Sequence, residues 1–220
     1  MTLDADAFIL ELDRTVQATL DRLGRASAAA TPAAEVTVAK LLVIALKNEL
    51  EAAEEAAVWM ASETDVQVKL ALARQCGDEA KHYRLIEERL RALGVDVASI
   101  DPLAQGYSPM FEFLRGLHTT VERIAAGQFT REALAKVRND VFADWCTSQG
   151  DDETARLYRE VIGPDEVHHH ELGRRLLARF ATHEAAQALA RNAALRTLEL
   201  AEEMQEIARL KRGIARAPGC

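Results

Sequence analysis

Two glutamate–histidine pairs are the residues of this sequence best suited to chemistry. Glu79 and His82 belong to the segment Asp-Glu-Ala-Lys-His, and Glu166 and His169 belong to Asp-Glu-Val-His-His. Residues three apart lie on one face of a helix, so each pair presents a carboxylate and an imidazole together. Both pairs interrupt apolar stripes, and a buried carboxylate must be paired, hydrogen-bonded or bound to a cation. We therefore predict that each pair is half of a metal site.

Glu49 is the next candidate ligand. It lies in a stripe of leucines and alanines, and the midpoint between Glu49 and Glu79 is residue 64, inside the predicted turn. Antiparallel helices joined at this turn bring the two carboxylates level with each other. Glu54 and Glu55 lie on other faces of the same helix and are predicted to be solvated.

The remaining carboxylate ligand has two candidates. Glu122 has alanines three and four residues after it, the same pattern that follows the first single carboxylate. Glu132 has the better spacing, because the midpoint between it and Glu166 is residue 149, in a predicted turn. However, the apolar stripe of its helix places Glu132 on the opposite face. We predict Glu122 as the ligand, with Glu132 as the alternative, and a π-bulge or break near Gly127 would bring Glu122 level with Glu166.

These candidates need helices to position them, and a helical period of apolar residues runs through the sequence. Clusters of Gly, Pro, Ser, Thr and Asp divide it into six predicted helices, at about residues 4–24, 31–61, 64–94, 108–148, 151–180 and 184–212. Thr31-Pro32 and Ser108-Pro109 are typical helix starts, and Gly163-Pro164 predicts a kink. Two helical hairpins joined by a long crossover, with a helix added at each end, predict an all-α four-helix bundle.

The length of 220 residues predicts a single domain, residues 1–220, with a sizeable core. Residues 1–30 would form an N-terminal helix and linker, residues 31–180 the bundle, and residues 181–220 a C-terminal helix and basic tail. Only 5% of the residues are aromatic and there are few Gly and Pro, which favours helix over strand.

Charge and cysteine content argue against several classes of function. The net charge of −8 counts against nucleic acid as a partner. No apolar run approaches the roughly 20 residues of a membrane span, so we expect no membrane association. The three cysteines are far apart and form no Cys-x-x-Cys pair, which predicts a cytoplasmic protein without a disulfide framework.

The doubled motif resembles the ferritin-like di-iron carboxylate superfamily, in which two Glu-x-x-His motifs and two single carboxylates on a four-helix bundle hold two metals. The resemblance covers about residues 31–180. It implies two iron ions, or one manganese and one iron, with each Glu-x-x-His pair chelating one metal and the carboxylates bridging or capping them. The implied ligand set is Glu49, Glu79, His82, Glu122, Glu166 and His169, with Glu132 in place of Glu122 as the alternative.

The resemblance also implies a class of reaction. We expect an oxidase or oxygenase that uses O2 and a small organic or acyl-type substrate, with an external electron donor, because the added helices would give a substrate pocket walls. The last predicted helix is long enough to join two subunits in a homodimer. The alternatives are an iron-handling or peroxide-detoxifying protein related to ferritins and rubrerythrins, and a metal-free helical interaction protein.

Overall fold

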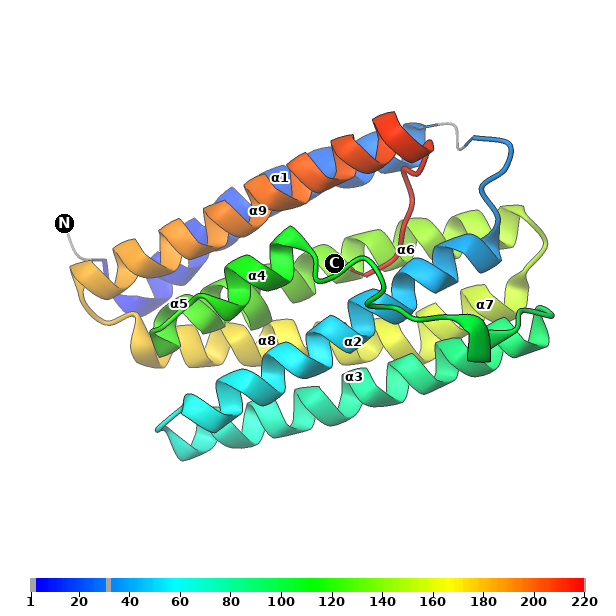
Figure 1. Ribbon diagram of the computed structural model, residues 1–220. Helices are drawn as coiled ribbons and strands as arrows, with labels where there is room; N and C mark the ends of the chain where they lie inside the picture. The colour runs from blue at the N-terminus through cyan, green and yellow to red at the C-terminus, as the bar shows by residue number, and fades with distance from the viewer. Residues whose placement is uncertain (1–2, 31–32, 220) are drawn as a thin grey trace.

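The computed structural model describes residues 3–30 and 33–219, and every regular element within these ranges is a helix (Figure 1). In chain order the elements are α1 (Ala5–Ala29), α2 (Val38–Ser62), α3 (Val66–Ala92), η1 (Val97–Ser99), α4 (Pro109–Arg115), α5 (Thr120–Ile124), η2 (Ala125–Arg131), α6 (Glu132–Ser148), α7 (Asp152–Leu157), η3 (Tyr158–Ile162), α8 (Gly163–Phe180) and α9 (Glu184–Arg212). The prediction of an all-α protein is confirmed. None of the helices in the described ranges is long and apolar enough to cross a bilayer.

The first hairpin consists of α2 and α3, which pack along each other in opposite directions (Figure 1). Thr37 caps the start of α2, and Asp65 caps α3 by accepting hydrogen bonds from two backbone N–H groups of its first turn. The turn between the helices is therefore where the sequence predicts it. The helix start predicted at Thr31-Pro32 lies outside the described residues, and α2 itself begins at Val38.

The second hairpin is more divided than the sequence predicts. Its first helix begins as expected at Pro109, after the N-cap Ser108, but α4 already ends at Arg115. A new helix starts after the N-cap Thr119 and continues without a break from α5 through η2 into α6. The helix break thus lies at residues 116–119, and Gly127 lies in the π turn η2 within continuous helix, which confirms the predicted π-bulge near this residue.

Both helices of the second hairpin contain a π-helical turn. η2 directly precedes α6, and within it the N–H of Glu132 bonds to the carbonyl of Gly127, five residues back. η3 directly precedes α8 and ends next to Gly163-Pro164, where the sequence predicts a kink. A π turn contains an extra residue, so it rotates the residues that follow relative to an uninterrupted α-helix. Glu132 and the Glu-x-x-His pair of α8 both come shortly after such a turn.

The flanking helices α1 and α9 lie side by side and cover the second hairpin on the side away from α2 and α3 (Figure 1). The sequence predicts that α1 ends near Gly24, but the helix continues to Ala29. A Cβ atom on Gly24 would lie 2.9 Å from Cγ1 of Val137 on α6. Gly24 is therefore a point of close helix packing and not a helix end.

Two non-helical segments complete the structure. The connection after α3 returns across the outside of α2, where the carboxylate of Glu51 accepts hydrogen bonds from both the backbone N–H and the hydroxyl of Ser108. After α9 the chain reverses at Gly213, and residues 213–219, the C-terminal tail, run down into the bundle between α2 and α6 (Figure 1). The tail thus reaches the region where the candidate ligands lie.

Candidate metal centre

Six buried acidic and histidine side chains from four helices meet in the interior of the molecule. They are Glu49, Glu79, His82, Glu132, Glu166 and His169. Their possible ligand atoms form two groups, in each of which all the atoms lie within 4.8 Å of one another: Glu79, Glu132, Glu166 and His169 in the first, and Glu49, Glu79 and His82 in the second. Glu79 belongs to both groups, which makes them one continuous cluster. This cluster could bind metal ions.

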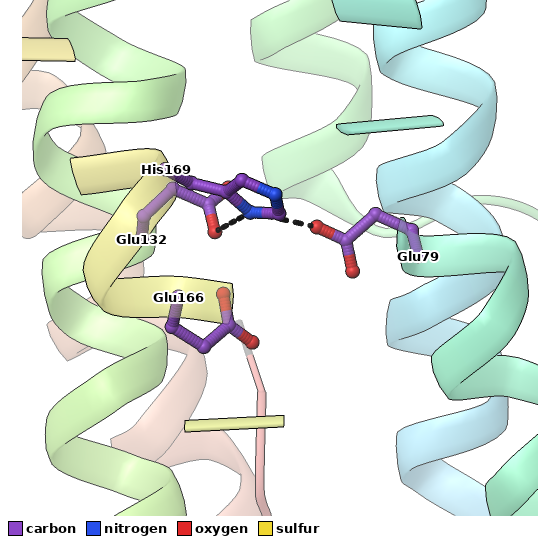
Figure 2. Close-up of side chains that lie close together, drawn as sticks. All are labelled: Glu79, Glu132, Glu166 and His169. Atoms are coloured by element: carbon purple, nitrogen blue, oxygen red, sulfur yellow. Dashed lines mark hydrogen bonds and ion pairs between the residues drawn. The ribbon is translucent and has the colours of Figure 1, made fainter. Parts of the chain in front are cut away.

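The first group joins the two hairpins. Glu79 points from α3 toward Glu132 of α6 and toward Glu166 and His169 of α8 (Figure 2). Nδ1 of His169 lies 3.3 Å from Oε2 of Glu132 and 3.5 Å from Oε1 of Glu79. The imidazole therefore bridges carboxylates that belong to different hairpins.

The second group lies within the first hairpin. Nδ1 of His82 lies 3.3 Å from Oε2 of Glu79 and 3.5 Å from Oε2 of Glu49. Both histidines thus turn the same ring nitrogen, Nδ1, toward the carboxylates. This equivalence follows from the repeated Glu-x-x-His spacing on two helices of similar environment.

The outer nitrogens of the two histidines are held by aspartates in a reciprocal arrangement. Nε2 of His82 lies 3.1 Å from Oδ2 of Asp165, and Nε2 of His169 lies 3.1 Å from Oδ2 of Asp78. Each aspartate precedes the glutamate of the opposite motif, so each motif orients the other's imidazole. An N–H donated from Nε2 to a carboxylate leaves Nδ1 as the ring nitrogen with a lone pair for a cation, and such partners raise the basicity of a ligand imidazole. Lys81 lies 2.5 Å from Asp165 and neutralises part of its charge.

The structure does not bring Glu122 to this cluster. Glu122 occupies the third position of α5, where its carboxylate accepts hydrogen bonds from the backbone N–H and the hydroxyl of Thr119. The hydroxyl of Thr119 in turn accepts from the N–H of Glu122, which is the reciprocal pattern of a capping box. The motif Thr-x-x-Glu identifies this role in the sequence, and the prediction did not use it. The predicted position of Glu122 in the site is therefore not supported by the geometry.

Glu132, the alternative, lies in the cluster because its helix has two buried faces. The apolar stripe of α6 includes Val137, which packs against α1. The polar face opposite this stripe, with Gln128, Glu132 and Asn139, is equally buried and faces the cluster. Oε1 of Glu132 accepts a hydrogen bond of 2.6 Å from Nε2 of Gln75 on α3. An apolar stripe marks the site-facing side only where a helix has a single buried face, and α6 is not such a helix.

A buried ion pair next to the cluster was missed by the sequence reasoning. Glu55, which was expected to be solvated, is buried and lies 2.7 Å from the guanidinium of Arg131. Burial raises the pKa of Glu55 to about 7, although the charge of Arg131 opposes this shift. The pair neutralises two interior charges directly beside Glu132, where an additional unpaired charge would be costly.

The pKa values of the cluster show that protons take the place of cations in the metal-free protein. Burial, with the charges of Glu132 and Glu49, raises the pKa of Glu79 to about 8. Burial by itself would lower the pKa of His82, but hydrogen bonds to Glu49 and Glu79 raise it to about 11. The pKa of His169 rises in the same way to about 9. At neutral pH these three groups therefore hold protons.

In the neighbouring pair of carboxyl groups, Glu166 is protonated and Glu132 is ionised. Burial and the charge of Glu132 raise the pKa of Glu166 well above its ordinary value. Burial acts on Glu132 in the same direction, but hydrogen bonds from Glu166 and His169 lower its pKa to about 2. Glu166 thus keeps a proton that it donates to an ionised Glu132. Proton sharing of this kind is expected where carboxylates are crowded together without a cation.

The six side chains are at most 3% exposed, and the centre contains little free space. A cavity of about 10 Å³ lies among the carboxylates and is bounded by Asn48, Arg131 and Gly219 of the tail. This volume corresponds to roughly one water molecule. Tyr158 is buried nearby, and its hydroxyl has no hydrogen-bond partner in the described part of the chain. Burial, together with the charges of Glu49 and Glu166, raises the pKa of this phenol well above 10, so Tyr158 is neutral.

The chemistry of this donor set fits metal ions in place of the protons. Four carboxylates and two imidazoles supply hard oxygen donors with one nitrogen donor for each ion, and in each imidazole Nδ1 already faces the carboxylates, so that loss of its proton would expose a lone pair there. Comparisons with protein-family models, with curated proteins and with solved structures found no match to this chain.

Proposed function

We propose that the six clustered side chains hold two divalent metal ions, one in each of the two groups that share Glu79. His82 with Glu49 would hold one ion, and His169 with Glu132 and Glu166 would hold the other. The observation that carries this proposal is that Glu79 belongs to both groups, which gives it the position of a bridging ligand. Hard oxygen donors with one imidazole for each ion suit iron, or manganese with iron.

The proposed metal centre also implies how the four helices of the bundle are arranged around it. Each hairpin contributes one single carboxylate and one Glu-x-x-His pair, and the aspartates before the motifs orient the histidines across the hairpins. These features support a ferritin-like di-metal bundle formed by α2, α3, α6 and α8.

We propose that the protein is an O2-using oxidase or oxygenase that acts on a small organic or acyl-type substrate. Two reduced iron ions would supply two of the four electrons needed for the reduction of O2, and the organic substrate or an external donor would supply the rest. The protein excludes bulk water from the centre and keeps the imidazoles oriented through Asp78 and Asp165. A larger cavity that could hold an organic substrate lies beside the centre, and this favours the oxidase over iron storage.

Metal content tests the metal proposal. After anaerobic reconstitution with Fe(II), the unmodified protein should retain two metal ions per chain. Glu132→Gln should retain about one, because it removes a charged ligand from the group around His169. Glu122→Gln is the matched control, since it changes the same residue type in a helix cap, and it should retain two. Equal metal content in both variants, or no bound metal in the unmodified protein, would contradict the proposed centre.

Oxygen uptake separates the proposed reaction from iron handling. A ferritin-like storage protein consumes O2 only as Fe(II) is added, whereas the proposed oxidase should consume additional O2 when an organic substrate and an electron donor are supplied. Uptake that depends only on added Fe(II) would favour iron handling.

A further inference from the structure

A second and much larger cavity lies on the other side of the C-terminal tail from the metal centre. Its volume is about 410 Å³, which is in the usual range for small-molecule sites. The walls are formed by α2, the connection before α4, the last turns of α9 and the tail itself. Much of the lining is apolar, including Ile44, Tyr107, Pro109, Met204, Ile207 and Ile214.

The charged residues around this cavity are all basic. They are Lys47, Arg138, Lys211 and Arg212, and no aspartate or glutamate belongs to the lining. This is unusual in a chain with a net charge of −8. Lys211 and Arg212 form no ion pair with a carboxylate of the described residues, and Arg212 donates only to the side-chain amide of Gln105. The cavity therefore combines apolar walls with two basic side chains, Lys211 and Arg212, to which the described residues supply no carboxylate partner.

A thin wall separates this cavity from the metal centre. Asn48 borders both cavities, and its Nδ2 donates a hydrogen bond of 2.8 Å to the carbonyl of Pro218. The N–H of Gly219 donates to Oδ1 of Asn139, and Nδ2 of Asn139 lies 3.3 Å from Oε1 of Glu166. The tail is thus the barrier between the outer cavity and a candidate metal ligand.

We propose that the outer cavity binds the organic substrate, and that this substrate is an aliphatic molecule with one anionic head group such as a carboxylate. This inference rests on the proposed oxidase function. Lys211 and Arg212 attract the head group at the mouth of the cavity, while the aliphatic body lies along the apolar wall. The end away from the head group then points toward the tail and the metal centre behind it.

The experiment measures binding of three probes with the same ten-carbon chain and different head groups: decanoate, decan-1-ol and decylamine. Titration calorimetry on the full-length protein should show one decanoate site per chain, with decanol binding at least fivefold more weakly and decylamine more weakly still. Equal affinities for the three probes, or tighter binding of decylamine, would overturn the proposal.

Variants connect this binding to the cavity. The double change Lys211→Gln with Arg212→Gln should weaken decanoate binding at least fivefold and leave decanol binding unchanged. The control is Lys136→Gln with Arg209→Gln, which removes the same charge from a half-buried and an exposed residue that pair with Asp140 and Glu206 outside the cavity. Ala208→Phe should weaken both probes by filling the cavity, and circular dichroism checks that each variant is folded. Equal losses in the test and control variants would show that only overall charge matters and would overturn the proposal.

The binding assay is independent of the metal assay. Decanoate binding is measured on metal-free and on reconstituted protein, with metal content determined on the same samples. Two bound metals without decanoate binding would overturn the substrate inference alone. Decanoate binding without bound metal would instead overturn the proposed function.

Discussion

Six acidic and histidine side chains at the centre of the bundle share protons with one another. Four carboxylates crowd together, and the pKa values of Glu79, His82 and His169 are raised until these groups hold protons at neutral pH. A metal ion must displace these protons, because a carboxylate or imidazole nitrogen cannot bind a proton and a cation with the same lone pair. Binding of a metal ion in the proposed centre would therefore depend on pH.

The raised pKa values predict in which direction metal affinity changes with pH. At pH 7 the solution is below the pKa values of about 8 for Glu79, about 9 for His169 and about 11 for His82. Metal binding should therefore release protons, and affinity should rise as the pH increases from 6 to 8. Calorimetry with Mn(II) in buffers of different ionisation enthalpy measures the number of protons released, which we expect to be at least two per chain at pH 7. Release of none would show that the ligands are already deprotonated.

The clustered residues differ in how well the sequence identifies them. Glu79 and His82, like their counterparts on α8, follow from a repeated three-residue spacing inside apolar stripes. Glu49 follows from its distance to a predictable turn. Glu132 satisfies the same distance rule, but the sequence favours Glu122, which shares the alanine pattern of Glu49, while the apolar stripe places Glu132 on the opposite face. The structure differs because α6 buries a polar face as well as an apolar one. That property depends on what packs on both sides of α6, and one helix's sequence does not contain it.

At the scale of elements, the π turn η2 is held by close contact with α8. A Cβ atom on Gly173 would lie 2.7 Å from both the carbonyl carbon of Gln128 and the backbone nitrogen of Phe129. One turn earlier on α8, Nδ1 of His170 lies 2.7 Å from the carbonyl oxygen of Phe129. Gly173 therefore permits the approach that allows the imidazole to hydrogen-bond to this turn.

We expect Gly173→Ala to destabilise the protein, because the new methyl group would meet backbone atoms that cannot rotate away. The cost of such overpacking is about 1–3 kcal/mol, which lowers Tm by roughly 2–4 °C for each kcal/mol in a chain of this size. Gly77→Ala is the matched control: Gly77 is also inside a helix, and its Cβ would have no neighbour within 4 Å. Alanine should stabilise that position by up to about 1 kcal/mol. Thermal unfolding followed by circular dichroism measures both, and a Gly173→Ala variant as stable as Gly77→Ala would contradict the packing argument.

On the scale of the whole molecule, the C-terminal tail packs against the candidate metal centre. The tail has no helical structure, yet its residues Pro218 and Gly219 are buried. Gly219 borders the inner cavity. Gly219 has a φ of +72°, and a Cβ atom there would lie 3.2 Å from both Cβ and Nδ2 of Asn48. The seated position of the tail thus depends on glycine at this residue.

Gly219→Ala should loosen the tail. A left-handed conformation costs a residue other than glycine roughly 1–2 kcal/mol, which corresponds to at least about a fivefold increase in the open population. Removal of bound metal by a chelator should become faster by a similar factor, as measured by stopped-flow absorbance. Gly150→Ala is the control, because Gly150 has a φ of +79° in the turn before α7, far from the tail in sequence and without neighbours at its Cβ position. Equal rates in the two variants would show that the tail does not limit access.

The sequence alone determined the helical class, the turn of the first hairpin, the helix start at Ser108-Pro109 and five of the six clustered side chains. Each of these depends on short-range rules: helical period, capping and the spacing of residues on one helix face. Only the tertiary structure decided that Glu132 lies in the cluster and that Glu55 is buried with Arg131. It also decided that the tail separates two cavities. These features depend on contacts between segments far apart in the chain, and local periodicity contains no information about such contacts.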